Sequence, residues 1–137
     1  ALSHKDIRGL VIGTRPDCVN DEILDLLKEL SEHCIVMIEF GIESCYDRTL
    51  LRINRGHTFA DAVKALEASH ARGLDTGAHF IFGLPGESRD EMLAEAGIIS
   101  ELPLTTVKFH QLQIIRGTEM EKEYAGNPSD FHLFYIY

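Results

Sequence analysis

The chain has 137 residues, of which 45% are hydrophobic and 26% charged, with a formal net charge of −9. This balance is typical of a soluble globular domain and excludes the basic footprint of a nucleic-acid-binding piece. No apolar run approaches the ~20 residues of a membrane span, and no signal peptide opens the chain, so the expected location is cytoplasmic.

Strand-like apolar runs alternate with helix-like segments from the start of the chain. The first strand is predicted over residues 9–13. A helix is predicted over residues 21–33, because Asn20 is a favourable N-cap and apolar residues then recur at helical spacing. The next apolar run predicts a strand over residues 36–42.

Two helical pieces are predicted after this strand. Ser44 has an aspartate three residues later, the spacing of a capping box, and Thr58 repeats that spacing. A turn at residues 54–56 separates the two pieces. Gly73 lies where the second helix would end in a left-handed cap.

The remaining elements continue the alternation. A third strand is predicted over residues 76–82, followed by a loop over residues 83–87 and a helix capped by Ser88. A fourth strand is predicted from about residue 106 to 114, and Thr118 opens one more helix. The helix after Ser88 is expected to place Met92, Ala96 and Ile99 on its apolar face.

This order predicts an α/β fold of about four consecutive βα units with a parallel sheet and right-handed crossovers. A four-stranded piece leaves two open sheet edges, and the apolar run at residues 133–137 needs a cover. We therefore expect a partner or a second copy of the chain to associate with these surfaces.

One face of the predicted sheet is unusually polar. Parallel strands covered on both faces should read as continuous apolar runs, and a closed barrel fills its interior mainly with Val, Ile and Leu. Here the alternation of side chains instead predicts a wet hollow for a polar ligand, with room provided by Gly13, Gly41 and Gly77. The polar side chains expected to face it are Glu39, Glu43, His79, Lys108 and His110. The alternative is the solvent-facing side of an open sheet.

Four segments of the sequence resemble the radical S-adenosylmethionine (SAM) superfamily. They are G-T-R-P-D-C at residues 13–18, I-E-F-G-I-E-S at 38–44, L-L-R-I-N-R-G-H at 50–57 and F-I-F-G-L-P-G-E at 80–87. The closest branch holds the oxygen-independent coproporphyrinogen dehydrogenases, the elongator catalytic subunit and the YhcC-type Fe–S oxidoreductases.

The resemblance implies a partial βα (TIM-like) barrel, in which residues 1–137 supply the third to sixth of six strands. In this family a Cys-x3-Cys-x2-Cys loop binds a [4Fe–4S] cluster, which reductively cleaves SAM to a radical that attacks the substrate. The substrate of this chain is unknown.

The resemblance also assigns part of the SAM site. Glu43, with Ser44 beside it, stands where the family contacts the ribose and amino-acid moiety, and Arg55 matches the arginine that holds the SAM carboxylate. His79 occupies the position of an acidic ribose ligand. Alternatives remain open for each: Glu43 pairs with Lys108, Arg55 is a solvated turn charge, or His79 is a satisfied interior histidine.

The resemblance places four residues around the adenine: Phe82, Gly83, Leu84 and Leu112. Alternation puts Phe82 on the helix side of its strand, so a core role for it also stays open. A family glutamate is common at the position of Gly13, and this chain departs from the pattern there.

Cys18, Cys34 and Cys45 lack the close spacing that cluster or zinc ligation needs. We therefore expect no metal ligand and no catalytic residue of its own in this chain, a cluster-binding part and a C-terminal part outside it, and no activity for the isolated chain. Two other functions stay open: a non-redox barrel enzyme using Glu43, His79 and Lys108 for acid–base chemistry, and a non-catalytic binding module.

Overall fold

A computed structural model describes residue 4 and residues 6–132 of the chain. Four parallel strands form one sheet in the order β1-β2-β3-β4. The strands are β1 (Gly9–Thr14), β2 (Ile35–Glu43), β3 (Asp75–Phe82) and β4 (Thr106–Gln111). The predicted α/β class with a parallel sheet is confirmed.

Helices follow each strand, as in βα units. The longer ones are α1 (Asp21–Ser31), α3 (Phe59–Ala71) and α4 (Arg89–Ser100), and the shorter ones are α2 (Asp47–Arg52) and α5 (Glu119–Gly126). Two 3-10 turns, η1 (Pro16–Cys18) and η2 (Pro128–Asp130), complete the described elements. None of these helices combines the length and the apolar character that a membrane crossing needs.

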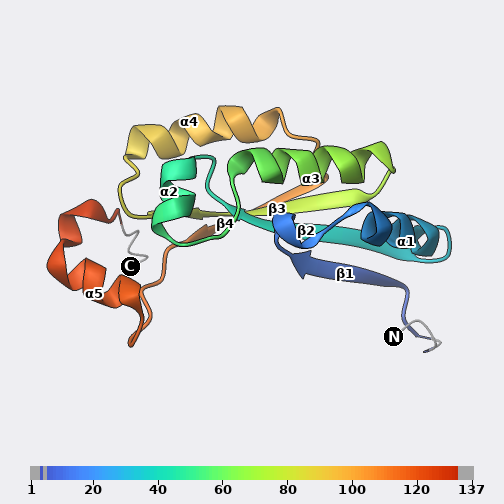
Figure 1. The fold of residues 1–137 in the computed structure, drawn as a ribbon, viewed down its shortest axis with the longest axis horizontal. Coiled ribbons are helices and arrows are strands. Elements are labelled where there is room, and N and C mark those ends of the chain that lie inside the picture. Colours follow the sequence, from blue (N-terminus) through green and yellow to red (C-terminus); the bar gives the residue numbers. More distant parts are fainter. Residues whose placement is uncertain (1–3, 5, 133–137) are drawn as a thin grey trace.

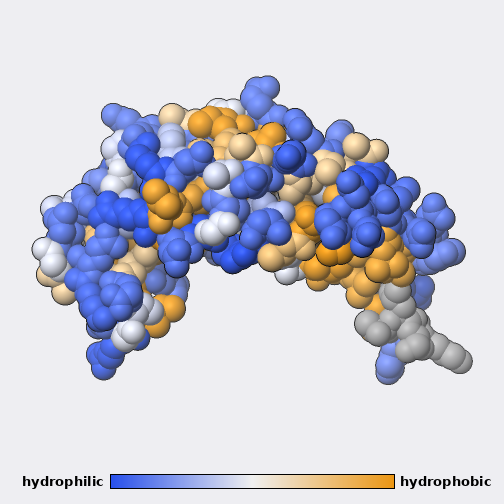
Figure 2. All heavy atoms as spheres, in the orientation of Figure 1, coloured by the Kyte–Doolittle hydropathy of each residue, from blue (hydrophilic) through white to orange (hydrophobic). Residues whose placement is uncertain are grey.

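The helices α1 to α4 all lie on one face of the sheet, and the opposite face is left open (Figure 1). The covered face forms the core because alternate strand residues point into it, and Ile38, Phe40 and Phe80 have no exposed surface. The open face is concave, so the molecule has the outline of an arch (Figure 2).

Three of the predicted helix caps are present as expected. The Asn20 side chain accepts a hydrogen bond from the Ile23 amide, and Thr58 and Ser88 each form a reciprocal capping box with the acidic residue three positions later. Gly73 has a φ of +70° just after α3, which is the left-handed conformation predicted there.

Other sequence-based details were wrong. Ser44 does not cap α2: the helix begins after Tyr46, which makes no side-chain cap bond. The fourth strand ends at Gln111, three residues earlier than predicted. On α4 the buried position between Met92 and Ile99 is Glu95, whereas Ala96 is exposed. The apolar run at residues 133–137 lies outside the described residues.

Candidate functional site

The concave face of the sheet carries the polar side chains that the alternation predicted. Glu39 lies within hydrogen-bond distance of both Lys108 and His79, and His79 contacts His110. These residues come from β2, β3 and β4. The predicted sharing of one face is therefore confirmed, and the site is assembled by strand register alone.

At the carboxyl end of β2, Arg55 and Glu43 form an ion pair above Gly41. The Arg55 Nη2 atom lies 3.1 Å from Glu43 Oε1 and donates a 2.7 Å hydrogen bond to the Gly41 carbonyl oxygen. A Cβ atom at Gly41 would overlap Arg55 Nη2 and lie 2.6 Å from Glu43 Oε1. Glycine is therefore required for the two charged groups to rest on the strand.

Glu43 has an unusual backbone conformation and a half-buried side chain. Its φ of +76° lies in the left-handed region, where the strand pairing shifts register between Gly41 and Glu43. Such a conformation costs of order 1 kcal/mol or more in a non-glycine residue and concentrates at functional sites. Burial raises the pKa of the Glu43 carboxyl, whereas the charge of Arg55 and the nearby His79 and His110 oppose this rise.

Lys108 pairs with Glu39, and not with Glu43 as one alternative held. Its Nζ atom lies 2.5 Å from Glu39 Oε1. This hydrogen bond is the main cause of a Glu39 pKa below its usual value. The other Glu39 oxygen lies 3.4 Å from His79 Nε2, and His79 Nδ1 lies 3.1 Å from His110 Nε2. Both His79 ring nitrogens are thus engaged within the chain, and its ribose role stays a prediction.

Ser44 faces away from the concave side. Its hydroxyl is fully buried and lies 2.5 Å from Glu87 Oε1 and 3.3 Å from Glu95 Oε1. The Cys45 amide donates a 2.7 Å hydrogen bond to the same Glu95 oxygen. Burial, reinforced by the charge of Glu87, raises the pKa of Glu95 to about 7. These two carboxylates hold the chain just after Glu43, and neither was predicted from the sequence.

The four residues expected around an adenine are not all brought to the concave face. Phe82 stacks on Phe109 with ring centroids 5.0 Å apart, which is the core-side alternative. Leu84 is 1% exposed, so its side chain belongs to the interior. Gly83 has a φ of +92°, and the carbonyl oxygen of His132 lies 2.6 Å from where its Cβ would be. Leu112 lies beside Gly83, with its Cβ 3.7 Å from the same position.

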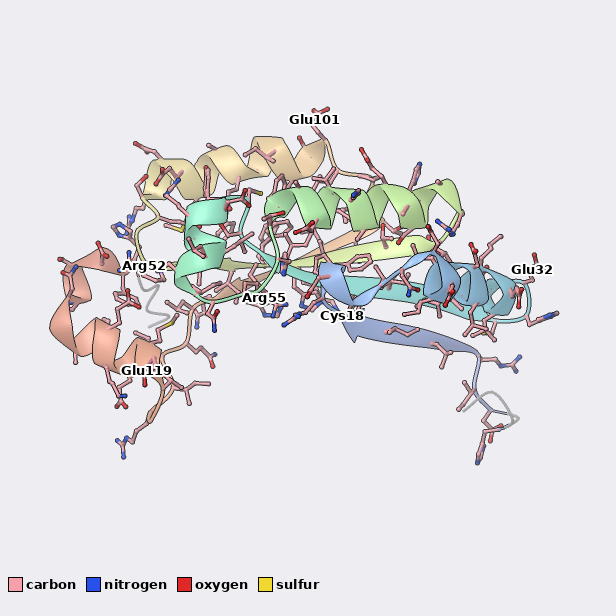
Figure 3. All side chains as sticks on the ribbon, viewed as in Figure 1. Cys18, Glu32, Arg52, Arg55, Glu101 and Glu119 are labelled. Atoms are coloured by element: carbon pink, nitrogen blue, oxygen red, sulfur yellow. The ribbon has the colours of Figure 1, made fainter. Side chains whose placement is uncertain are left out.

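The L-L-R-I-N-R-G-H segment places two arginines and a histidine in distinct roles. Arg52 points toward α5, where it pairs with Glu123 and Asp130, whereas Arg55 points to the sheet (Figure 3).

His57 is 93% buried, and neither ring nitrogen has a hydrogen-bond partner. Burial, followed by the charge of Arg55, lowers the pKa of His57. Arg15 is paired with Asp17 in the neighbouring loop.

The three cysteines do not come together. Cys18 is exposed, Cys34 is half-buried and Cys45 is buried beneath the Glu95 network, where burial raises the pKa of its thiol. Within the described part of the chain, no group of three or more His, Cys, Asp or Glu side chains is arranged to hold a metal ion.

Comparison with known proteins identifies relatives over most of the chain. The sequence model described as Radical SAM superfamily matches residues 1–96. The uncharacterized protein MJ0486 of Methanocaldococcus jannaschii is 43% identical over 90% of this chain and 39% of its own length. The protein YhcC of Escherichia coli is 42% identical over 92% of this chain and 41% of its own length.

The fold has solved counterparts as well. The structure of Elp3 from Methanocaldococcus infernus, with an N-terminal deletion, superposes with a TM-score of 0.77 and 28% identity over 92% of this chain and 29% of that one. The predicted partial βα (TIM-like) barrel is confirmed by this likeness. The chain spans only about two fifths of the length of the curated relatives quoted above.

Proposed function

Because this chain belongs to the radical SAM superfamily, we propose that it forms the SAM-binding part of a radical SAM enzyme. The observation that supports this most directly is the Arg55–Glu43 pair above Gly41, at the carboxyl end of a parallel strand. Ligands of βα folds bind at this end of the sheet.

The pair suits the charged groups of the SAM amino-acid moiety. That moiety carries one carboxylate and one ammonium group on the same carbon atom. A guanidinium binds a carboxylate through two parallel hydrogen bonds, and the neighbouring carboxylate of Glu43 can accept from the ammonium. Arg55 keeps 24% of its side chain exposed and Glu43 keeps 15%, so both remain accessible from the concave face.

The carboxyl of Glu43 has a further reason to favour a cation. Its pKa is raised because burial disfavours the charged form. An ammonium group brought beside it would supply a second positive partner and stabilise the ionised carboxylate. Arg55, released in part from Glu43, would then direct its free donors to the substrate carboxylate. The arrangement thus fits a zwitterion better than a simple anion.

The family also implies a [4Fe–4S] cluster, and the cysteines described above do not fit one. We propose that the cluster is held by a part of the protein outside these residues, in keeping with the greater length of the relatives. A bound cluster supplies the electron for reductive cleavage of SAM. The residues of this chain bind and orient SAM, and the isolated chain is expected to be inactive.

The test is SAM affinity in the complete protein, purified anaerobically and reconstituted with iron and sulfide. Arg55→Lys replaces the planar fork by a point charge, so we expect SAM to bind at least ten-fold more weakly and 5′-deoxyadenosine formation to fall in parallel. Arg72→Lys is the matched control, because Arg72 pairs with Asp21 and Asp25 on the helical side. Equal SAM affinity in both variants would contradict the proposal.

Air exposure separates this proposal from the two other functions. A radical SAM enzyme loses 5′-deoxyadenosine formation in air because its cluster is oxidised. A non-redox enzyme based on Glu43, His79 and Lys108, or a binding module, would keep its function under the same treatment.

A further inference from the structure

A second group of side chains lies on the concave face beside the Arg55–Glu43 pair. We propose that His110 is the proton-accepting residue for the substrate, held ready by a hydrogen-bonded chain that runs from Glu39 through His79. The inference rests on the proposed function, because it places the substrate on the same face as SAM. We call these three residues, with Lys108, the relay.

The relay is continuous across three strands. Glu39 Oε2 lies 3.4 Å from His79 Nε2, and His79 Nδ1 lies 3.1 Å from His110 Nε2. The centroids of the two imidazole rings lie 5.1 Å apart and the ring planes are inclined by 24°, so the two rings are close to coplanar in direction and meet through their nitrogen edges. Because β2, β3 and β4 are neighbours in the sheet, this order is fixed by the backbone and needs no loop.

The Glu39 carboxylate, at one end of the relay, fixes the direction of every hydrogen bond in it. An ionised carboxylate only accepts, so His79 must donate through Nε2–H to Glu39. A neutral imidazole carries one proton, so His79 Nδ1 is then an acceptor, and His110 must donate to it through Nε2–H. The Nδ1 atom of His110 is left with its lone pair and without a proton. This is the logic of the carboxylate–histidine pair in hydrolases, extended by one ring.

Lys108 keeps the carboxylate end of the relay ionised. Its ammonium group lies 2.5 Å from Glu39 Oε1, on the oxygen that His79 does not use. Gly77 leaves space for this arrangement, since a Cβ there would lie 3.3 Å from Glu39 Cγ and 2.7 Å from Thr106 Oγ1. The lysine therefore satisfies one oxygen and leaves the other to orient His79.

The His110 end of the relay is solvent-exposed and lies close to the proposed SAM site. His110 is exposed on the concave side, while the Glu39 side chain keeps only 14% of its surface exposed. Both histidines are near enough to Glu43 for their charge to act on its carboxyl. Gly13, which pairs with Glu39 in the sheet, would have nothing within 4 Å of a Cβ. A polar molecule therefore has access to this face from the side of β1.

The step assigned to the relay is a proton transfer. A substrate O–H or N–H gives its proton to His110 Nδ1, and the bonding electron pair stays on the substrate oxygen or nitrogen. The charge of the resulting imidazolium is stabilised through His79 by Glu39, and the proton later leaves to water. The substrate class is therefore a polar molecule that offers such a group beside the SAM site.

The first test reads the ring protons directly, by 15N NMR of histidine-labelled complete protein. We expect His79 and His110 both to carry the proton on Nε2 in the neutral state. In Glu39→Gln the amide can donate as well as accept, so both rings should become tautomer mixtures. Glu67→Gln on the outer surface of α3 is the matched control and should change neither ring. A proton on His110 Nδ1 in the unmodified protein would overturn the proposal.

The second test uses diethyl pyrocarbonate, which acylates unprotonated imidazole nitrogens. We expect His110 to react at least ten-fold faster than His79. His110→Ala removes the donor that covers His79 Nδ1, so His79 should then gain at least ten-fold in rate. His110→Gln keeps a side-chain N–H donor and should restore the protection of His79. Unchanged reactivity of His79 in His110→Ala would refute the relay.

SAM affinity, measured in the same samples, keeps the two proposals apart. Unaltered SAM binding in His110→Ala together with the reactivity change supports both. Mixed tautomers of His79 and His110 in the unmodified protein, together with intact, Arg55-dependent SAM binding, would overturn the relay alone. Absence of SAM binding in the unmodified, reconstituted protein overturns the proposed function, and the relay with it.

Discussion

The guanidinium of Arg55 and the carboxylate of Glu43 meet 3.1 Å apart above a strand residue that has no side chain. Gly41→Ala tests this directly, because its methyl group would occupy the place of both charged ends. These ends belong to flexible side chains, so we expect them to move aside while the free energy of unfolding changes by less than about 1 kcal/mol. The Arg55 Nε–H signal in NMR should lose its protection from exchange, and SAM should bind at least ten-fold more weakly.

Gly13→Ala is the control for this substitution. Gly13 also lies on the concave face, but an added Cβ would have nothing within 4 Å. The Arg55 signal should therefore be the same as in the unmodified protein. An Arg55 signal that responds equally to both alanines would show that the close approach at Gly41 is not what positions the pair.

A second prediction concerns the buried Glu95. Its pKa of about 7 in the folded protein exceeds the ordinary value of 4.5, so the folded state retains a proton that the unfolded chain loses. The free energy of unfolding should fall as the pH rises from about 4.5 to about 7, by on the order of 3 kcal/mol, and then level off. Glu95→Gln should remove most of this slope in urea unfolding at pH 5, 6, 7 and 8.

Glu101→Gln, an exposed position at the end of the same helix, should leave the slope as it is. The glutamine at position 95 keeps an oxygen that can accept from the Cys45 amide, so the variant is expected to fold. A slope that survives in Glu95→Gln would mean that another group binds the proton.

A third prediction concerns the attachment of the segment from α5 to η2. Arg52 donates a 2.7 Å bond to Glu123 and a 2.5 Å bond to Asp130, and thereby ties both elements to α2. Arg52→Ala should increase amide hydrogen exchange over residues 119–130 several-fold. Partly exposed ion pairs contribute little, so the loss in overall stability should stay within about 1–2 kcal/mol.

Arg48→Ala is the matched control for that experiment. Arg48 lies on the same helix but pairs with Glu91 on α4, so exchange over residues 119–130 should not change. Similar exchange in the two variants would exclude Arg52 as the anchor.

Local rules explain why most of the fold could be predicted from the sequence. Asn20, Thr58 and Ser88 act through bonds to residues three positions away, and such spacing is visible in the chain. The sharing of one face by Glu39, His79 and His110 follows from strand alternation in the same way. Which helix residues would face the core was predicted less well, because the rotation of a helix is set by its packing.

The errors concern contacts between distant parts of the chain. Ser44 had the spacing of a cap, but its hydroxyl is taken by Glu87 and Glu95, 43 and 51 residues further on. The pairing of Lys108 with Glu39 depends on strand register, which the sequence did not specify. The sequence signal for Glu95 is a carboxylate between Met92 and Ile99 at helical spacing, which puts it, and not Ala96, on the buried face of α4.

The left-handed backbone at Glu43 restricts what evolution can place there. Valine or isoleucine would strain the chain further, whereas glycine would relax it and asparagine or aspartate would fit with little penalty. A glycine at this position should raise the free energy of unfolding, but it removes the carboxylate. Two constraints therefore act on residue 43: its backbone conformation favours small or polar side chains, and the proposed SAM site needs an acid. A relative with glycine at this position is expected to have lost the proposed SAM contact.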